Sequence, residues 1–178
     1  PFTARYDAAI RQSQSLLRLG LGVTWTFRDL QSEQQRFDDK RAFAQSNFFY
    51  LSADVNYQYE FSNGARLSGR LTTQWTDQLL ISNEQFSVGG AQSVRGYYES
   101  QALGDRGYAA SLEWQTKNLS TSTWLNESRW HLFYDIANVT VIDPLPEQTA
   151  NFNLASAGMG YRFTAWKQWR GEIDAGYA

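Results

Sequence analysis

The sequence predicts an all-β protein, an antiparallel transmembrane β-barrel with about eight strands in this chain. Three observations predict it. Apolar and polar residues alternate over long segments, the connections between these segments are alternately long and short, and aromatic residues gather near the segment ends. A tilted strand that faces lipid on one side and a wet lumen on the other needs about ten alternating residues to cross a bilayer.

Eight segments alternate with a period of two, so each carries one apolar face. They cover residues 2–11, 17–28, 49–61, 66–75, 110–115, 130–136, 155–163 and 169–177. In the second segment, for example, Leu17, Leu19, Leu21 and Val23 share one face. A soluble β-sandwich also alternates, but its strands usually have about five or six residues. Several segments here are longer than that, and their polar faces carry frequent charges, which favours the membrane barrel.

The connections divide the predicted barrel into two ends. Residues 29–47, 77–107 and 140–152 are long, residues 62–64 and 164–168 are short, and 118–128 is intermediate. Aromatic residues fall near both ends, as expected for rings that settle at the headgroups. Near the short turns these are Tyr59, Phe61, Trp114, Trp130, Tyr161, Phe163, Trp166 and Trp169, and near the long loops Trp25, Phe27, Phe49 and Trp75. By the usual polarity of such barrels, the short turns are periplasmic and the long loops extracellular.

Composition argues against several other classes of protein. The chain has no cysteine, one histidine and a formal net charge of −2, so neither a thiolate metal site nor nucleic-acid binding through bulk charge is indicated. His131 has lumen parity, and such a histidine is more often structural or solvated than catalytic. No Gly-x-Ser-x-Gly elbow or phosphate-binding loop occurs. We therefore expect no enzymatic activity, no cofactor and no metal.

The long segment 77–107 contains the most informative residues of the chain. Gly89, Gly90 and Gly96 permit backbone conformations that residues with a Cβ resist. Arg95 lies between Val94 and Gly96, so its five-donor guanidinium is held in a compact, partly apolar loop. Such a group calls for carboxylate partners, preferably in a bidentate pairing.

These residues carry a resemblance to a known family. Phe86, Gly89-Gly90, the Ser93-Val94-Arg95-Gly96-Tyr97 run, and Gly104-Asp105 with Gly107 resemble the signature loop of the two-partner secretion transporters, the haemolysin activator and filamentous haemagglutinin transporter type. These proteins belong to the outer-membrane polypeptide-transport superfamily, which also includes the insertases that assemble other barrels. In this superfamily the loop folds back into the lumen, and its arginine pairs with acids on the next strands.

The resemblance implies two partners for Arg95. Phe133-Tyr134-Asp135-Ile136-Ala137 resembles the superfamily's Phe-x-Asp-x-Gly motif, with Ala137 in place of the glycine. Glu113 has lumen parity on the first strand after the loop. We therefore expect Arg95, with Val94, Gly96 and Tyr97, to form a lock with Asp135 and Glu113. Gly104 and Asp105 are expected to form the turn at the loop's return.

The resemblance also implies how much of a complete protein this chain contains. Its eight segments correspond to strands 8–15 of a 16-stranded barrel, which we expect to be a monomeric pore when complete. The remaining strands and the periplasmic domains that precede the barrel are not in this sequence.

The expected function is translocation of an unfolded partner polypeptide across the bacterial outer membrane without nucleotide hydrolysis. The expected partners are that secreted polypeptide and outer-membrane lipid. Two alternatives remain. The chain could belong to an insertase for other β-barrels, or it could be a small, closed eight-stranded barrel with a structural or adhesive role. In the last case the two terminal strands would pair with each other.

Overall fold

A computed structural model describes residues 1–26 and 47–178. Eight long strands form the main sheet: β1 (Phe2–Arg11), β2 (Ser15–Trp25), β3 (Phe49–Glu60), β4 (Arg66–Trp75), β7 (Arg106–Gln115), β8 (Leu125–Thr140), β9 (Asn151–Ala165) and β10 (Trp169–Tyr177). The segment between β4 and β7 holds a 3-10 helix, η2 (Ser82–Glu84), and two short strands, β5 (Phe86–Val88) and β6 (Ala102–Gly104). Within the described ranges, no helix is long and apolar enough to span a bilayer. The predicted segment 17–28 ends outside the described residues, as do most of the predicted loop 29–47 and the belt residue Phe27.

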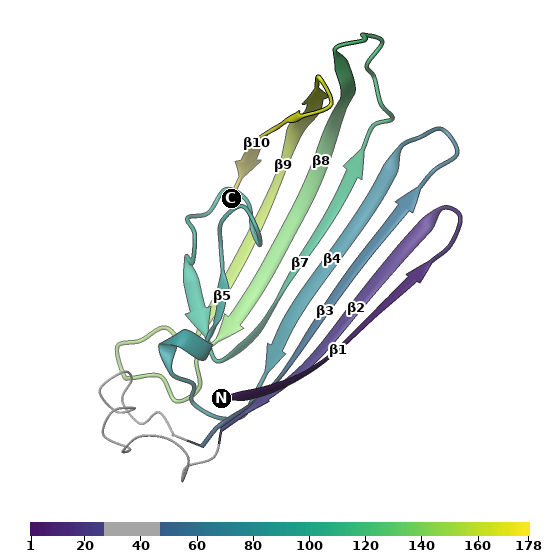
Figure 1. Ribbon diagram of the computed structural model, residues 1–178. Coiled ribbons are helices and arrows are strands. Elements are labelled where there is room, and N and C mark those ends of the chain that lie inside the picture. Colours follow the sequence, from purple (N-terminus) through teal and green to yellow (C-terminus); the bar gives the residue numbers. More distant parts are fainter. Residues whose placement is uncertain (27–46) are drawn as a thin grey trace.

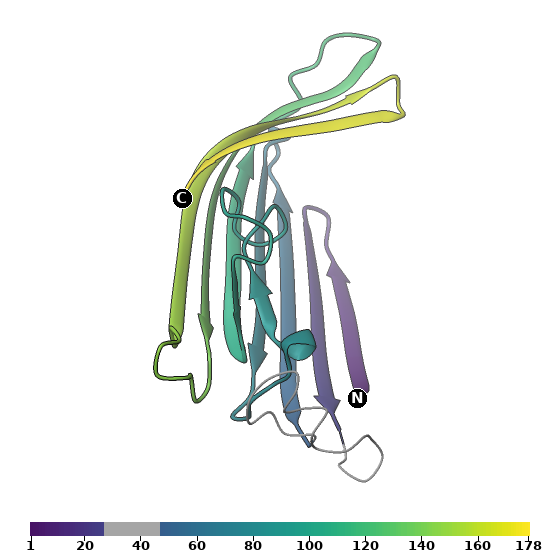
Figure 2. The same ribbon diagram turned by 90° about the vertical axis from the view of Figure 1, so that its left-hand side faces the viewer.

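The main sheet is antiparallel throughout, with the strand order β1-β2-β3-β4-β7-β8-β9-β10. It forms a curved wall with short turns at one end and long connections at the other, and the N-terminus lies at the long-loop end (Figures 1 and 2). Among the described residues, β1 and β10 each pair with one neighbour only. The sheet is therefore open, and the alternative of a small closed eight-stranded barrel is wrong.

The strand register places the predicted apolar residues on one continuous face. Directly paired residues point to the same side of a sheet, and the pairs Leu21↔Ala53, Leu112↔Tyr134 and Leu132↔Met159 all join residues predicted to be apolar-facing. All of these side chains except the half-buried Ala53 are exposed. Polar residues on the opposite face are buried, among them Gln74, Glu113, Gln115, Arg129, His131, Asp135 and Ser156. This distribution is the reverse of a soluble protein and fits an apolar face turned to lipid.

The outward face supplies a direct test of its contact with lipid. Leu112 lies near the middle of β7 and is 54 % exposed. We expect Leu112→Arg to destabilise the inserted barrel by about 2–4 kcal/mol, because it brings a charge to the bilayer midplane. Thr72→Arg on β4, whose side chain lies on the polar face, is the matched control and should assemble normally. Folding into lipid vesicles, followed by urea titration, measures both, and equal stability of the two variants would contradict the assignment of faces.

The polar face is concave and holds the segment between β4 and β7. A cavity of about 590 Å³ is lined by side chains from β2, β3, β4, β7, β9 and β10, so the sheet curves around this side. The segment 77–107, predicted as one long loop, is partly ordered into the β5–β6 pair, and β7 already begins at Arg106. The predicted connections 118–128 and 140–152 are also shorter, because β8 is a 16-residue strand.

Candidate luminal ion-pair site

The loop that carries Arg95 is shaped by glycines in the left-handed region. Gly89, Gly90 and Gly96 have φ angles of 108°, 90° and 94°, which residues with a Cβ rarely adopt. A backbone bridge joins Gly90 to Val94, and the Ser93 hydroxyl bonds both the N–H and the carbonyl of Gly89. These contacts close a tight turn whose next residue, Arg95, faces the wall of the sheet.

An apolar cluster fastens the base of this turn to the sheet. Val94 is fully buried, and it packs with loop residues and with residues of β7, β8 and β9. The cluster comprises Val88, Val94, Ala102, Ala109, Ala137, Val139 and Leu154, with Phe86, Tyr97 and Phe152 against it. Ala137, the departure from the family's glycine, thus contributes to the surface on which the loop rests. The Tyr97 hydroxyl adds a 3.3 Å hydrogen bond to the carbonyl of Ala155.

Arg95 makes a bidentate pairing with Asp135 of β8. Its Nε donates to Oδ2 at 2.8 Å and its Nη2 to Oδ1 at 2.9 Å. The backbone N–H of Arg95 also donates to Oδ2 at 3.1 Å, and the Ser111 hydroxyl donates to Oδ1 at 2.6 Å. Asp135 is 1 % exposed, so these donors replace the water that its carboxylate has lost. The fork geometry is the strongest pairing available to a guanidinium.

Glu113 of β7 is the second acid on Arg95. The Arg95 Nη1 donates to Oε2 at 2.7 Å, and the Arg95 guanidinium carbon lies 3.6 Å from the centre of the Phe133 ring. Burial lowers the pKa of Arg95, but its hydrogen bonds to Asp135 and Glu113 outweigh this and raise the pKa above its ordinary value. Arg95 therefore remains a cation held by two carboxylates and an aromatic face. The structure thus brings together all three charged residues that the sequence singled out for the lock.

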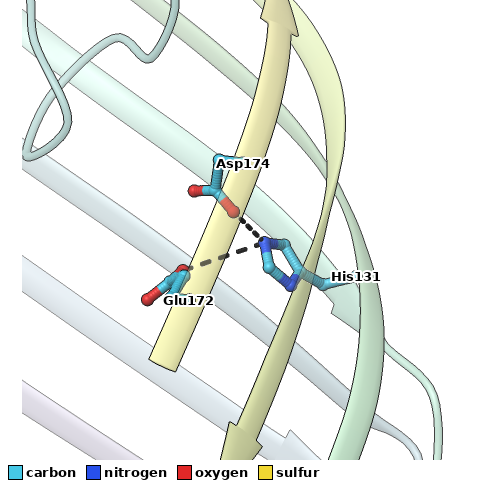
Figure 3. A group of neighbouring side chains, drawn as sticks. All are labelled: His131, Glu172 and Asp174. Carbon is cyan, nitrogen blue, oxygen red and sulfur yellow. Dashed lines mark hydrogen bonds and ion pairs between the residues drawn. The ribbon is translucent and has the colours of Figure 1, made fainter. Parts of the chain in front are cut away.

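The ion pairs continue beyond these three residues into a closed ring. Arg162 of β9 binds Glu113 at 2.7 Å and also Glu172 of β10. Asp174, also on β10, lies 3.5 Å from Arg95 Nη1. His131 of β8 contacts both β10 acids, with Nε2 2.7 Å from Asp174 and 3.8 Å from Glu172 (Figure 3).

The sequence prediction missed Arg162, Glu172 and Asp174 as members of the site. The alternation had placed Glu172 and Asp174 on the polar face, so lumen parity was the available signal. Parity gives the side of a strand but not which residues on distant strands meet.

The interpretation of His131 as a solvated residue is wrong, whereas a structural role stays a prediction. Its side chain is 1 % exposed, because the residue lies on the concave face beneath β10. The donor atoms of His131, Glu172 and Asp174 lie within 4.8 Å of one another, a spacing that could accommodate a metal ion. Both carboxylates are already paired with arginines, however, so the arrangement is better described as an ion-pair network.

Asp105 is a buried anchor and not a simple turn residue, which corrects the prediction. Its carboxylate is fully buried and accepts hydrogen bonds from the backbone N–H groups of Leu80 (3.0 Å) and Ile142 (2.7 Å). Gly104 precedes it, and a Cβ there would lie only 2.7 Å from the carbonyl oxygen of Thr140. Gly104 and Asp105 therefore fasten the loop's return to the neighbouring connection between β8 and β9.

Comparison with known proteins agrees with this geometry. A family model described as haemolysin secretion/activation protein ShlB/FhaC/HecB matches residues 3–163. The chain is 32 % identical over 100 residues to the outer membrane transporter CdiB of Dickeya dadantii (strain 3937), covering 55 % of this chain and 17 % of that protein. The structure resembles CdiB from Escherichia coli with a TM-score of 0.74 and 16 % identity, over 98 % of this chain and 32 % of that chain.

The chain therefore spans about a sixth of the curated relative and a third of the solved one. The structural likeness supports the barrel fold, and the predicted location in the bacterial outer membrane is confirmed. Because the family model matches most of the sequence, the resemblance predicted from the Val94-Arg95-Gly96-Tyr97 loop is confirmed as well. The chain belongs to the haemolysin secretion/activation protein family ShlB/FhaC/HecB, the two-partner secretion transporters of the outer membrane.

Proposed function

We propose that this chain forms part of an outer-membrane pore that translocates an unfolded partner polypeptide without nucleotide hydrolysis. Its family membership supports secretion over the assembly of other barrels. In the proposed arrangement the chain supplies strands 8–15 of a 16-stranded barrel. The complete protein would add the remaining strands and the periplasmic domains that recognise the partner.

The observation that carries the mechanism is the bidentate Arg95–Asp135 pair on the concave face. A folded-back loop fixed to the wall occupies lumen space that a translocating chain would need. We therefore assign Arg95, Val94, Gly96 and Tyr97 to a lock that holds the loop in the resting pore. Val94 and Gly96 position the arginine, and the carboxylates of Asp135 and Glu113 bind its guanidinium. The mechanism requires the lock to be maintained at rest and released or rearranged during transport.

Arg95→Ala in the complete transporter tests this role. We expect secretion of the partner polypeptide to fall although the pore opens more often, because an unlocked loop no longer starts from the resting position that transport requires. The fall should be at least about tenfold, the factor that corresponds to the loss of one buried hydrogen bond to a charged group. The barrel should still insert, since the strand register does not depend on this side chain. Immunoblotting of the culture medium measures secretion, and the heat-dependent mobility of the barrel on gels measures assembly.

Arg11→Ala is the matched control, because Arg11 is an exposed arginine at the short-turn end of β1, away from the lock. It should secrete at the level of the unaltered protein. Normal secretion by Arg95→Ala would overturn the assigned role of the loop, whereas loss of the assembled barrel in that variant alone would show that Arg95 serves folding.

A further inference from the structure

His131 and Asp174 face each other across an intervening strand. Gly160 of β9 pairs in register with His131 of β8 on one side and with Asp174 of β10 on the other. A Cβ at position 160 would overlap both the imidazole and the carboxylate. The glycine therefore leaves a notch through which a β8 side chain contacts a β10 side chain directly, as Figure 3 shows for His131 and Asp174.

The two imidazole nitrogens have different surroundings. Nε2 lies 2.7 Å from Asp174 Oδ1, whereas Nδ1 is buried and has no hydrogen-bond partner in the described structure. A buried N–H without an acceptor is rarer and less favourable than a buried acceptor without a donor. Nε2 is therefore the imidazole nitrogen that carries a hydrogen and donates it to Asp174.

Asp174 in turn faces the lock. Its second oxygen, Oδ2, lies 3.5 Å from Arg95 Nη1, so the carboxylate lies between His131 and Arg95. Among the described ion pairs of Arg95, the one with Asp174 reaches β10, since the other acids on Arg95 belong to β7 and β8. The position of the Asp174 carboxylate therefore contributes to the attachment of β10 to the loop, beside the backbone approach of Arg95 to Gly176.

We propose that His131 is a positioning residue of the lock, whose imidazole holds Asp174 toward Arg95 and so helps to tie β10 to the loop. The inference rests on the proposed function of the loop. It extends the lock from two wall strands to the whole β7–β10 segment, with Gly160 as the position that makes the contact possible. Release of the loop then also breaks its side-chain contact with β10, while β10 stays paired with β9.

Two amide substitutions separate this role from a general structural one. The amide nitrogen of His131→Gln lies near the position of Nε2 and can donate to Asp174, but it cannot become charged at any pH. The amide of His131→Asn lies near the position of Nδ1 and falls short of Asp174. We expect His131→Gln to keep the opening frequency of the complete transporter in planar lipid bilayers. His131→Asn should raise that frequency by about tenfold, the factor for one hydrogen bond to a charged group. Equal behaviour of the two variants would overturn the proposal.

A second pair tests the notch without altering either partner. Gly160→Ala should raise the opening frequency as His131→Asn does. Gly69→Ala, where a Cβ would meet nothing within 4 Å, should behave as the unaltered protein. Arg95→Ala, measured in the same bilayers, separates the role of the lock from the role of His131. If Arg95→Ala leaves the pore closed, the lock itself is wrong. If Arg95→Ala opens it but His131→Asn and Gly160→Ala do not, only the role of His131 fails.

Discussion

Asp135→Ala is expected to weaken the attachment of the loop by about 3–5 kcal/mol, the range for removing one partner of a buried ion pair. The substitution leaves the buried Arg95 with Glu113 and Asp174 but without its bidentate acceptor, and it also removes the acceptor of the Ser111 hydroxyl. Hydrogen exchange of the peptide that spans 89–97 measures the effect, because the Arg95 N–H itself donates to Asp135. Exchange there should accelerate by at least about a hundredfold.

The matched control for Asp135→Ala is Asp7→Ala. Asp7 also pairs with an arginine, Arg5, but its side chain is 63 % exposed. Surface pairs contribute about 0–1 kcal/mol, so this variant should change neither exchange in the loop nor pore opening. A double-mutant cycle with Arg95→Ala adds a second check. Hydrogen exchange in the loop should be little faster in the double variant than in either single variant. Fully additive losses would show that the two residues act independently.

The lipid-facing pattern of the sheet could be predicted from the sequence because each strand obeys its own alternation. Whether Leu112 faces lipid depends on the polarity of its neighbours along β7, which is local information. The same parity placed Glu113 and Asp135 on the inner wall. Strand ends were predicted less well. The predicted segment began at residue 130, whereas β8 begins at Leu125 and includes Ser128 and Arg129, where polar residues interrupt the apolar periodicity.

The candidate site was predicted only as far as a short motif reached. Arg95 and Asp135 were identified through runs of residues that resemble family motifs. The structure places Arg95 Nε 2.8 Å from Asp135 Oδ2. Arg162 and Asp174 belong to the same network but stand in no such motif. Their contacts depend on the sheet's curvature and on Gly160, where a missing side chain allows a contact across a strand. A one-dimensional pattern contains neither the curvature nor the contact.

Asp105 is another residue whose contacts could not be predicted from the sequence pattern. Its carboxylate is fully buried, and it joins the start of the loop at Leu80 to the connection between β8 and β9 at Ile142. Asp105→Ala would leave two backbone N–H groups without this acceptor, each at a cost of about 1–3 kcal/mol. We therefore expect a loss of about 2–6 kcal/mol in the local stability of the long-loop end. Hydrogen exchange at Leu80 and Ile142 should accelerate accordingly.

This loss should be separable from the lock because Asp105 lies at the loop's return, whereas Arg95 is held by acids deeper on the wall. Pore opening should therefore change less in Asp105→Ala than in Asp135→Ala, although exchange at Leu80 and Ile142 changes more. Asp77→Ala, an exposed aspartate just after β4, is the control and should leave exchange at both positions unaltered. Asp105→Ala could instead open the pore as fully as Asp135→Ala. In that case the loop is attached as one cooperative unit, and the separation between the anchor at Asp105 and the lock at Arg95 is wrong.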